Sequence, residues 1–247
     1  MTLYVIGDIH GQDAMLDTAL DRIERDGVPG AEVIFLGDYV DRGPDSRAVL
    51  DCLTTGLSEG RNWTCLRGNH DHMFHAFLEN GALADDNIKS GLLWTHYRLG
   101  GLDTLRSYGI DADEYSDPED LHRQAKEAVP AAHRDFLAGL PLFAERGDVL
   151  CVHAGIRPGV ALPEQVIDDL IWIRDPFLET KDPHPWLVVH GHTAIKRPTH
   201  YGNRINMDAG AGYDRPLKVG VIEGDAVFLL EDKGRVALPV TPGARRR

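Results

Sequence analysis

The sequence predicts an α/β fold in which two packed β-sheets are flanked by helices. Short apolar runs recur about thirty residues apart in the first third of the chain, and one strand–helix–strand unit takes about thirty residues or more. After residue 141 the pattern changes to closely spaced short strands, and Gly224-Asp225 marks a hairpin. Because no Gly-, Ser- or Pro-rich linker and no internal repeat separates the two halves, we expect a single domain over residues 1–247.

The first half should alternate strands with helices. The expected strands cover residues 3–6, 33–36 and 64–66. Apolar residues at helical spacing predict a helix over 13–25. Ser46 suits the N-cap of a second helix that ends near Gly56, and a third helix should begin at His70 and end at Gly81.

Residues 82–141 contain no convincing strand and are expected to form a helical insertion near the functional site. Its expected helices cover residues 92–108, 118–128 and 130–140. The expected strands that follow cover residues 142–145, 149–152, 186–190, 204–207, 218–223 and 226–230. Residues 241–247, which include the basic run Arg245-Arg246-Arg247, are expected to be a frayed tail.

Composition excludes several classes of protein. The 247 residues are 43% hydrophobic, yet no stretch approaches the roughly twenty apolar residues of a membrane span. The chain starts on a strand without a signal segment, so a cytoplasmic location is expected. A net charge of −13 argues against a nucleic-acid partner. The three cysteines, Cys52, Cys65 and Cys151, are scattered among apolar residues, which argues against a disulfide framework or a zinc–thiolate site.

Polar residues suited to metal binding follow the expected strands. The first three strands are followed by Gly7-Asp8-Ile9-His10-Gly11, Gly37-Asp38-Tyr39-Val40-Asp41-Arg42-Gly43 and Gly68-Asn69-His70-Asp71. Two later strands are followed by His153-Ala154-Gly155 and by the segment His190-Gly191-His192-Thr193. The carboxyl ends of parallel strands meet at one edge of a sheet, where α/β folds place their sites. These oxygen and imidazole ligands therefore predict a two-metal centre, in which Asp38 is the central candidate for a bridging carboxylate.

The five segments together resemble the calcineurin-like metallophosphoesterases. The triplet Asp41-Arg42-Gly43 is similar to the bacterial form of the phosphoprotein phosphatase branch, and Asp208-Ala209-Gly210 resembles a further element of the family. The resemblance implies a four-layer αββα sandwich of two mixed sheets flanked by helices. In the insertion, a patch that includes Trp94 and Gly100-Gly101 resembles bacterial phosphatases of this branch, although a packed helix with a Gly-Gly turn explains it equally well.

The resemblance also implies which residues hold the ions. Asp8, His10 and Asp38 would bind one metal ion. The second metal ion would be bound by Asp38, Asn69, His153 and His192. This mixed oxygen and nitrogen set, without thiolate, suits Mn²⁺ best, with Fe²⁺ or Zn²⁺ as alternatives. Hydrolysis would then proceed by in-line attack of a hydroxide that bridges the two ions.

The same resemblance suggests roles for the neighbouring residues. His70 would be the general acid, and Asp41 would orient its ring. Arg42 would clamp a phosphoryl oxygen, since a guanidinium fork matches phosphate geometry. Arg174 is the stronger candidate for a second phosphate clamp and Arg157 the weaker one. The last ambiguous residue is His190, for which we expect a supporting or structural role.

Two functions remain in competition at this stage. The leading one is a metal-dependent phosphomonoesterase of the serine/threonine protein phosphatase type, which would act on a phosphorylated protein or a small phosphoester. The alternative is a bis(5′-nucleosyl)-tetraphosphatase that cleaves diadenosine tetraphosphate. Asp41 favours the phosphatase, because the tetraphosphatases commonly differ there, whereas Asp71 replaces the Glu of eukaryotic protein phosphatases. A nuclease and a non-catalytic binding module are disfavoured by the acidic charge and by the His70–Asp41 pair, respectively.

Overall fold

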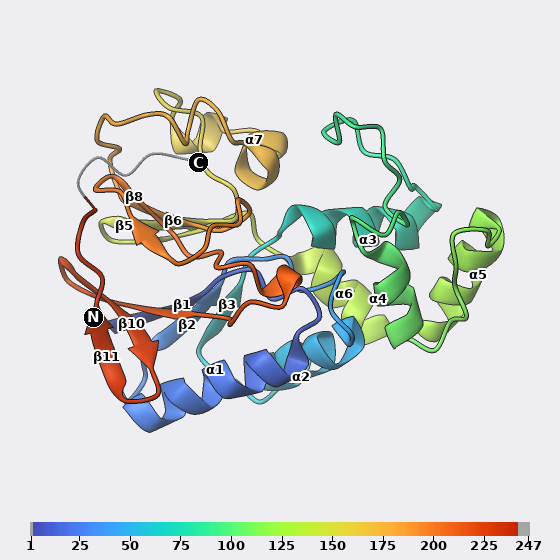
Figure 1. Ribbon diagram of the computed structural model, residues 1–247, viewed down its shortest axis with the longest axis horizontal. Helices are drawn as coiled ribbons and strands as arrows, with labels where there is room; N and C mark the ends of the chain where they lie inside the picture. The colour runs from blue at the N-terminus through green and yellow to red at the C-terminus, as the bar shows by residue number, and fades with distance from the viewer. Residues whose placement is uncertain (1, 242–247) are drawn as a thin grey trace.

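The computed structural model describes residues 2–241 and contains two β-sheets with helices on both outer sides (Figure 1). The strands are β1 (Thr2–Ile6), β2 (Glu32–Phe35), β3 (Trp63–Cys65), β4 (Phe143–Arg146), β5 (Val149–Val152), β6 (Leu187–His190), β7 (Thr199–His200), β8 (Arg204–Asn206), β9 (Val219–Glu223), β10 (Ala226–Glu231) and β11 (Gly234–Ala237). The helices are α1 (Asp13–Asp26), α2 (Ser46–Ser58), α3 (Asn69–Asn80), α4 (Gly101–Ser107), α5 (Pro118–Ala128), α6 (Ala131–Gly139) and α7 (Ile167–Trp172), with 3-10 turns η1 (Leu162–Glu164) and η2 (Ala211–Tyr213).

The first sheet has the strand order β11-β10-β9-β1-β2-β3. Strands β1, β2 and β3 are parallel, as the strand–helix–strand spacing predicted, whereas β9, β10 and β11 are antiparallel. The hairpin expected at Gly224-Asp225 joins β9 to β10, with Glu223 paired to Ala226. The second sheet has the order β4-β5-β6-β8-β7, in which β5, β6 and β8 are parallel and the two edge strands are antiparallel.

Alternation along the strands divides the core into three layers. In β1, Tyr4 and Ile6 pack against the helices that cover the first sheet, whereas Leu3 and Val5 pack between the two sheets. Burying one such aliphatic side chain contributes about 1.5–3 kcal/mol relative to its exposure. The third layer lies between the second sheet and α7. The expected αββα sandwich of two mixed sheets is therefore confirmed.

Two local predictions were wrong. The helix expected over 92–108 is limited to α4, because Gly100 takes a left-handed conformation with φ +92° and interrupts the apolar pattern. The N-cap of α2 is Asp45, whose side chain accepts a hydrogen bond from Ala48 N at 2.9 Å. Ser46 is fully buried and instead accepts a hydrogen bond from the backbone N–H of Asp41 at 3.0 Å.

The insertion projects from one side of the sandwich and carries α4, α5 and α6, drawn in green and yellow-green in Figure 1. Helix α5 was predicted with its observed bounds, and α6 differs by one residue at each end from its expected range. Within residues 2–241, no helix is both long enough and apolar enough to cross a membrane. In the expected frayed tail, residues 242–247 lie outside the described part of the chain.

Candidate active site

The strands of both sheets deliver the candidate ligands to one edge of the sandwich. Asp8 lies two residues beyond β1 and Asp38 three residues beyond β2, while Asn69 is the first residue of α3. From the second sheet, His153 directly follows β5 and His192 lies two residues beyond β6. The structure thus brings these five residues, with His10, to one place where the two sheets meet.

The backbone at this edge is held in an unusual conformation. Among the described residues, six non-glycine residues have positive φ, and five of them are candidate site residues. These five are His10 (51°), Asp38 (54°), Asp41 (74°), Arg42 (68°) and His192 (64°). Such residues cost of order 1–3 kcal/mol each and persist where the surrounding structure enforces them. Here the close approach of loops enforces them, because a Cβ at Gly43 would collide with His10 O and one at Gly68 with Asp38 N.

Asp38 occupies the centre of the cluster. Its Oδ2 lies 3.6 Å from His10 Nε2, and its Oδ1 lies 3.4 Å from His153 Nε2. The backbone N–H of His70 also donates to Oδ1 at 2.9 Å. Potential ligand atoms fall into two groups, His10–Asp38–His70 and Asp38–His153–His192, each within 4.8 Å. Asp38 belongs to both groups, which is the position that a bridging carboxylate requires.

The ring tautomers leave lone pairs pointing into the cluster. His10 Nδ1 donates to Val40 O at 2.9 Å and His153 Nδ1 donates to Leu36 O at 2.8 Å, since a carbonyl can only accept. Burial lowers the pKa of both imidazoles, which favours their neutral form. The Nε2 of neutral His153 is then an acceptor that faces another acceptor, Asn69 Oδ1, at 3.0 Å.

A cation would satisfy these facing lone pairs. The buried Nε2 of His192 has no hydrogen-bond partner among the described residues, and its Nδ1 lies 2.8 Å from Asn69 Oδ1. On the other side, burial and the neighbouring carboxylates of Asp208 and Asp38 raise the pKa of Asp8 well above its usual range. Such a cluster of buried acids and neutral imidazoles fits divalent metal ions, because unpaired charges are costly to bury and metals need deprotonated ligands.

Asp208 was noted in the sequence but received no role there. Its side chain is 3% exposed, and burial raises its pKa to about 6. Its Oδ1 accepts from Gly210 N at 2.8 Å, so it is fixed beside Asp8 by the turn that follows β8. The signal that could have found it was the Asp-Ala-Gly turn after a buried strand, the same placement that marked the other ligands.

Arg42 points both guanidinium nitrogens into the site. Its Nη1 lies 2.7 Å from His10 Nε2 and its Nη2 lies 2.9 Å from His70 Nε2. The guanidinium also lies over the ring of Tyr213, 5.1 Å from the centroid. Two N–H donors on one planar guanidinium are the arrangement that recognises a phosphoryl group.

The insertion holds the pair formed by His70 and Asp41. His70 Nδ1 donates to Asp41 Oδ2 at 2.6 Å, and the carboxylate also accepts from Trp94 Nε1 at 2.8 Å and Thr104 Oγ1 at 2.6 Å. Burial raises the pKa of Asp41 to about 7, which these donors oppose, and burial lowers the pKa of His70 to about 3. Thr104 was missed by the sequence analysis, because nothing in its local pattern distinguishes it from other helix residues.

The other three candidate residues, Arg157, Arg174 and His190, have different surroundings. Arg157 forms a two-pronged ion pair with Asp169 of α7, at 2.8 and 2.6 Å, and is thereby engaged away from the histidines. Arg174 lies two residues beyond α7, and its charge adds to the burial that lowers the pKa of His192 and His153. His190 is buried between Gly191 O, at 3.0 Å, and Arg204, at 3.2 Å, which is a structural placement.

Asp71 anchors the loop that presents Asp38. Its carboxylate accepts backbone N–H groups from Asp38 at 2.7 Å, Tyr39 at 2.8 Å and Gly68 at 2.9 Å. It therefore fixes the second segment against the start of α3. This residue, which was noticed for differing from the Glu of eukaryotic phosphatases, supports the ligand loop from outside the ligand cluster.

Comparison with known proteins was made on both sequence and structure. A model of the calcineurin-like phosphoesterase family matches residues 1–215. The asymmetrical bis(5′-nucleosyl)-tetraphosphatase of Anoxybacillus flavithermus is 27% identical over 240 residues, covering 86% of this chain and 87% of that protein. A crystal structure of a candidate diadenosine tetraphosphatase superposes with a TM-score of 0.62 at 20% identity, covering 98% of this chain and 95% of that chain. The cold-active protein-tyrosine phosphatase of a psychrophilic Shewanella superposes with a TM-score of 0.63 at 16% identity, covering 96% and 80%. These two structural likenesses establish the fold alone.

Proposed function

The chain belongs to the calcineurin-like phosphoesterase family, and from that premise we propose that its substrate is a bis(5′-nucleosyl) polyphosphate such as diadenosine tetraphosphate. The family makes it a metal-dependent hydrolase. The observation that carries the choice of substrate is the match to a named tetraphosphatase along 86% of the chain. This observation favours the alternative of the sequence analysis over its leading interpretation, the protein phosphatase.

In this proposal, Asp8, His10 and Asp38 would hold one divalent ion. The ligand atoms that lie together there belong to His10, Asp38 and His70, and Asp8 is linked to them through its charge interaction with Asp38. The other ion would be held by Asp38, Asn69, His153 and His192. When bound, the ions would supply the nucleophile at neutral pH and offset the charge of the phosphoryl oxygens. The donor set suits Mn²⁺, with Fe²⁺ or Zn²⁺ as alternatives.

The surrounding side chains would bind the phosphoryl group and supply the proton for the leaving group. Arg42 donates both guanidinium nitrogens to the reacting phosphoryl group, in place of the histidine nitrogens that they now contact. In this structure Nε2 of His70 accepts from Arg42 and carries no proton. His70 would act as the general acid once Arg42 turns to the phosphoryl group and Nε2 takes up a proton, which then passes to the leaving oxygen while Asp41 holds the Nδ1–H and stabilises the charged ring. Arg174, whose charge acts on His192, is the second phosphate clamp in this scheme.

The distribution of arginines supports a polyphosphate substrate. Arg42 lies within hydrogen-bond distance of His10 and His70, Arg98 lines the cavity next to it, and the charge of Arg174 adds to the burial that lowers the pKa of His70. These guanidinium groups gather in a chain whose net charge is −13. Several arginines around one centre match the several negative charges of a phosphate chain.

A serine/threonine phosphatase is the second candidate, because one observation favours it. Asp41 is fully buried and orients His70, and a general acid matters most for an alkoxide leaving group such as that of phosphoserine. A nucleotide phosphate is a better leaving group and needs less protonation. The His70–Asp41 pair therefore keeps the phosphatase as a candidate to be tested directly against the tetraphosphatase.

The deciding experiment compares the two substrates on one preparation. Metal-stripped protein is reloaded with Mn²⁺, and kcat/KM is measured for diadenosine tetraphosphate and for a phosphoserine peptide. We expect diadenosine tetraphosphate to be preferred by about 100-fold or more. Chromatography of the products distinguishes cleavage to AMP and ATP from cleavage to two ADP. An equal or reversed preference would contradict the proposal and favour the phosphatase.

A further inference from the structure

A cavity of about 550 Å³ adjoins the candidate active site. We call it the tyrosine cavity, and its lining includes Arg42, Tyr97, Arg98, Leu99, Asp103 and Tyr213. We propose that it binds the nucleoside attached to the reacting phosphate, with its base stacked on Tyr97 and Tyr213. The substrate class in this inference rests on the proposed function, whereas the cavity itself is tested independently below.

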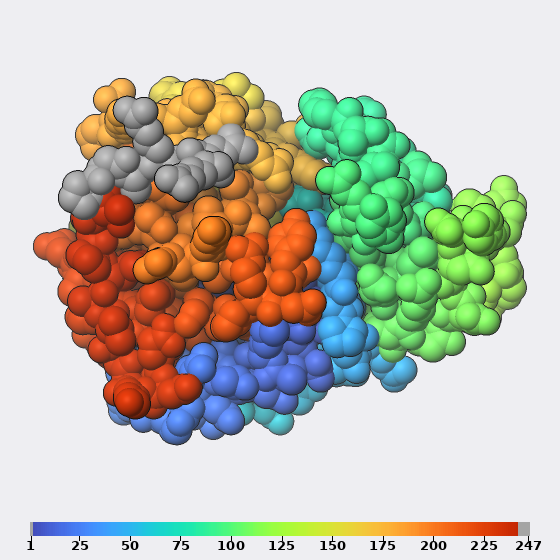
Figure 2. All heavy atoms as spheres, in the orientation of Figure 1, coloured from blue at the N-terminus to red at the C-terminus, as the bar shows by residue number. Residues whose placement is uncertain are grey.

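The tyrosine cavity lies between two parts of the chain that are distant in sequence. The insertion contributes Tyr97 and Arg98, and the turn η2 contributes Gly212 and Tyr213. Figure 2 shows a hollow between the green insertion and the orange C-terminal segment, with blue N-terminal residues between them. A substrate in this hollow would therefore contact the site and the insertion together.

The cavity opens directly from the phosphate-binding position. Arg42 is shared by the active site and the tyrosine cavity, since its guanidinium contacts His10 and His70 and its side chain lines the cavity. A Cβ at Gly212 would lie 2.6 Å from His10 Cδ2 and 3.1 Å from Arg42 Cδ, so η2 passes against the site without a side chain. A group bonded to a phosphate held by Arg42 thus enters this cavity first.

The two tyrosine rings are presented for stacking. Tyr97 is 77% exposed and Tyr213 is 57% exposed, although both are large aromatic side chains. Each ring is nevertheless supported, Tyr97 by the His96 ring at 4.5 Å and Tyr213 by the guanidinium of Arg42 at 5.1 Å. Supported aromatic rings with open surface are the platforms on which proteins stack nucleobases.

Polar groups complete a nucleoside site. The Asp103 carboxylate lines the cavity and can accept hydrogen bonds from ribose hydroxyls. Arg98 supplies a guanidinium at the same wall, where a further phosphate of the chain would lie. Base, sugar and phosphate thus each meet a matching side chain.

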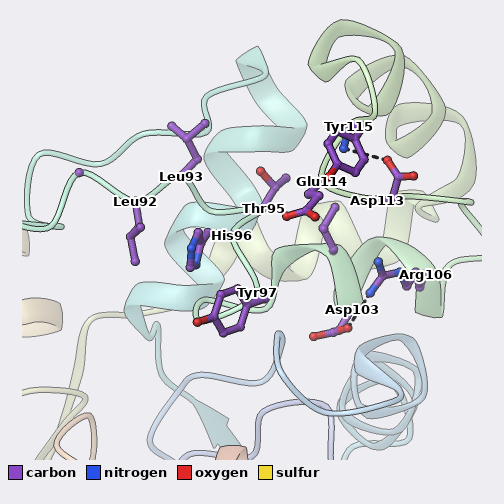
Figure 3. Close-up of a pocket in the computed structure, with 12 residues that line it drawn as sticks. Leu92, Leu93, Thr95, His96, Tyr97, Asp103, Arg106, Asp113, Glu114 and Tyr115 are labelled. Atoms are coloured by element: carbon purple, nitrogen blue, oxygen red, sulfur yellow. Dashed lines mark hydrogen bonds and ion pairs between the residues drawn. The ribbon is translucent and has the colours of Figure 1, made fainter.

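A neighbouring cavity of about 730 Å³ provides a control. It shares Leu92, Tyr97 and Asp103 with the tyrosine cavity, and Figure 3 shows Tyr115 on its far side, away from Tyr97. Its far side also carries the carboxylates of Asp113 and Glu114, which repel phosphate. Tyr115 is 87% exposed and lines only this neighbouring cavity, so it is a matched residue outside the proposed subsite.

The test measures binding of AMP and of ribose 5-phosphate, which differ by the base alone. Calorimetric titration of the Mn²⁺-loaded protein should show AMP binding about tenfold more tightly than ribose 5-phosphate, the contribution of a stacked base. Tyr97→Leu and Tyr213→Leu should remove this advantage, whereas Tyr97→Phe, Tyr213→Phe and Tyr115→Leu should keep it. The ratio of kcat/KM for diadenosine tetraphosphate to that for p-nitrophenyl phosphate should fall by a similar factor in the two leucine variants.

The outcomes separate this inference from the proposed function. Equal binding of AMP and ribose 5-phosphate by the wild-type protein would overturn the inference, even if diadenosine tetraphosphate is hydrolysed. Loss of the advantage in Tyr115→Leu but not in Tyr97→Leu would also overturn it. An AMP advantage that depends on both Tyr97 and Tyr213, in a protein that does not cleave diadenosine tetraphosphate, would support the subsite and contradict the proposed function. Thermal denaturation of each variant verifies that the fold is retained.

Discussion

The sheet edge and the helical insertion contribute to the same site in different ways. At the edge, Asp38 lies three residues beyond β2 and His153 directly follows β5, and both residues are at most 2% exposed. From the insertion, Trp94 and Thr104 reach back 53 and 63 positions to Asp41. Both regions are assembled only in the folded chain, since His192 reaches Asn69 across 123 positions. The difference is that each edge ligand follows a buried strand in the sequence, whereas Trp94 and Thr104 have no such local signal.

The difference extends to exposure. The ligand cluster is buried and its backbone is held in left-handed conformations, which suits fixed geometry for metal ions. The insertion instead presents Tyr97 at 77% exposure, which suits recognition of a substrate. We infer that the edge determines the chemistry and that the insertion orients the general acid and selects the substrate.

The largest effect is expected at the centre of the edge. Asp38→Asn should lower the turnover of p-nitrophenyl phosphate by about a thousandfold or more, since the amide cannot offer a charged ligand to both groups. Assays at saturating Mn²⁺ measure this effect. Asp214→Asn is the matched control, because Asp214 is the one described non-glycine residue with positive φ that is not a candidate site residue. Comparable activity of the two variants would contradict the central role assigned to Asp38.

The second-largest loss of turnover is expected on replacing the proposed general acid, His70. His70→Asn is expected to lower turnover about 10²–10⁴-fold while the protein keeps its metal. The loss should be greater for an alkyl phosphate than for p-nitrophenyl phosphate, because nitrophenolate leaves with little protonation. His72→Asn, two positions along α3, is the control and should retain turnover. Loss of metal in His70→Asn would contradict its assignment and make His70 a ligand, as its place in the first ligand group allows.

Trp94→Phe, at the contact between the insertion and the sheet edge, is expected to lower kcat about tenfold. Trp94→Phe keeps the stacked ring beside Phe74 but removes the N–H donated to Asp41. Loss of such a supporting partner typically costs 10–100-fold, and here kcat for an alkyl phosphate should fall with KM unchanged.

The control for Trp94 is Trp186→Phe. The Trp186 indole also donates to a carboxylate, that of Glu145, at 2.8 Å, but this pair lies on the second sheet away from Asp41. Equal losses in the two variants, or an equal loss for alkyl and nitrophenyl phosphates in Trp94→Phe, would mean that Trp94 supports the fold without positioning His70.

The smallest expected effect is a loss of stability on breaking the ion pair between Arg146 and Glu32, which joins the two sheets. Arg146 of β4 donates to both Glu32 oxygens at 2.7 Å and holds the pKa of Glu32 below its usual value. This pair therefore stabilises the fold above the unfolded pKa of about 4.3, and the contribution is lost as pH falls through the lower folded pKa. Glu32→Gln should lower the free energy of unfolding by about 0.5–1 kcal/mol at pH 7, with the deficit shrinking in acid.

Urea denaturation of metal-stripped protein at pH 7 and at acidic pH measures this difference. Glu145→Gln, in the same edge strand as Arg146, is the control and should change stability by less than about 0.5 kcal/mol at either pH. A deficit in Glu32→Gln that grows as the pH falls would contradict the assigned direction of the pKa shift.

The contrast between the two regions also explains what the sequence could predict. The two sheets followed from the thirty-residue spacing of the first strands and the hairpin-rich second half, the four layers from the family resemblance, and each ligand from its place after a buried run of residues. The role of Asp71 could not be predicted, because two of its three backbone partners, Asp38 and Tyr39, lie on a loop 33 and 32 positions away in the sequence. The helix over 92–108 was overestimated because the left-handed Gly100 breaks it. Strands β7 and β11 were missed because one has two residues and the other is largely exposed.

Counting bound metal ions tests the central claim most directly. The claim is that both sheets together hold a pair of ions that share Asp38. Equilibrium dialysis of metal-stripped protein against Mn²⁺, with elemental analysis of the retained metal, should give two ions per wild-type chain and a clear reduction in Asp38→Asn. One ion or none in the wild-type protein, or two in Asp38→Asn with unchanged affinity, would contradict a two-ion site shared through Asp38.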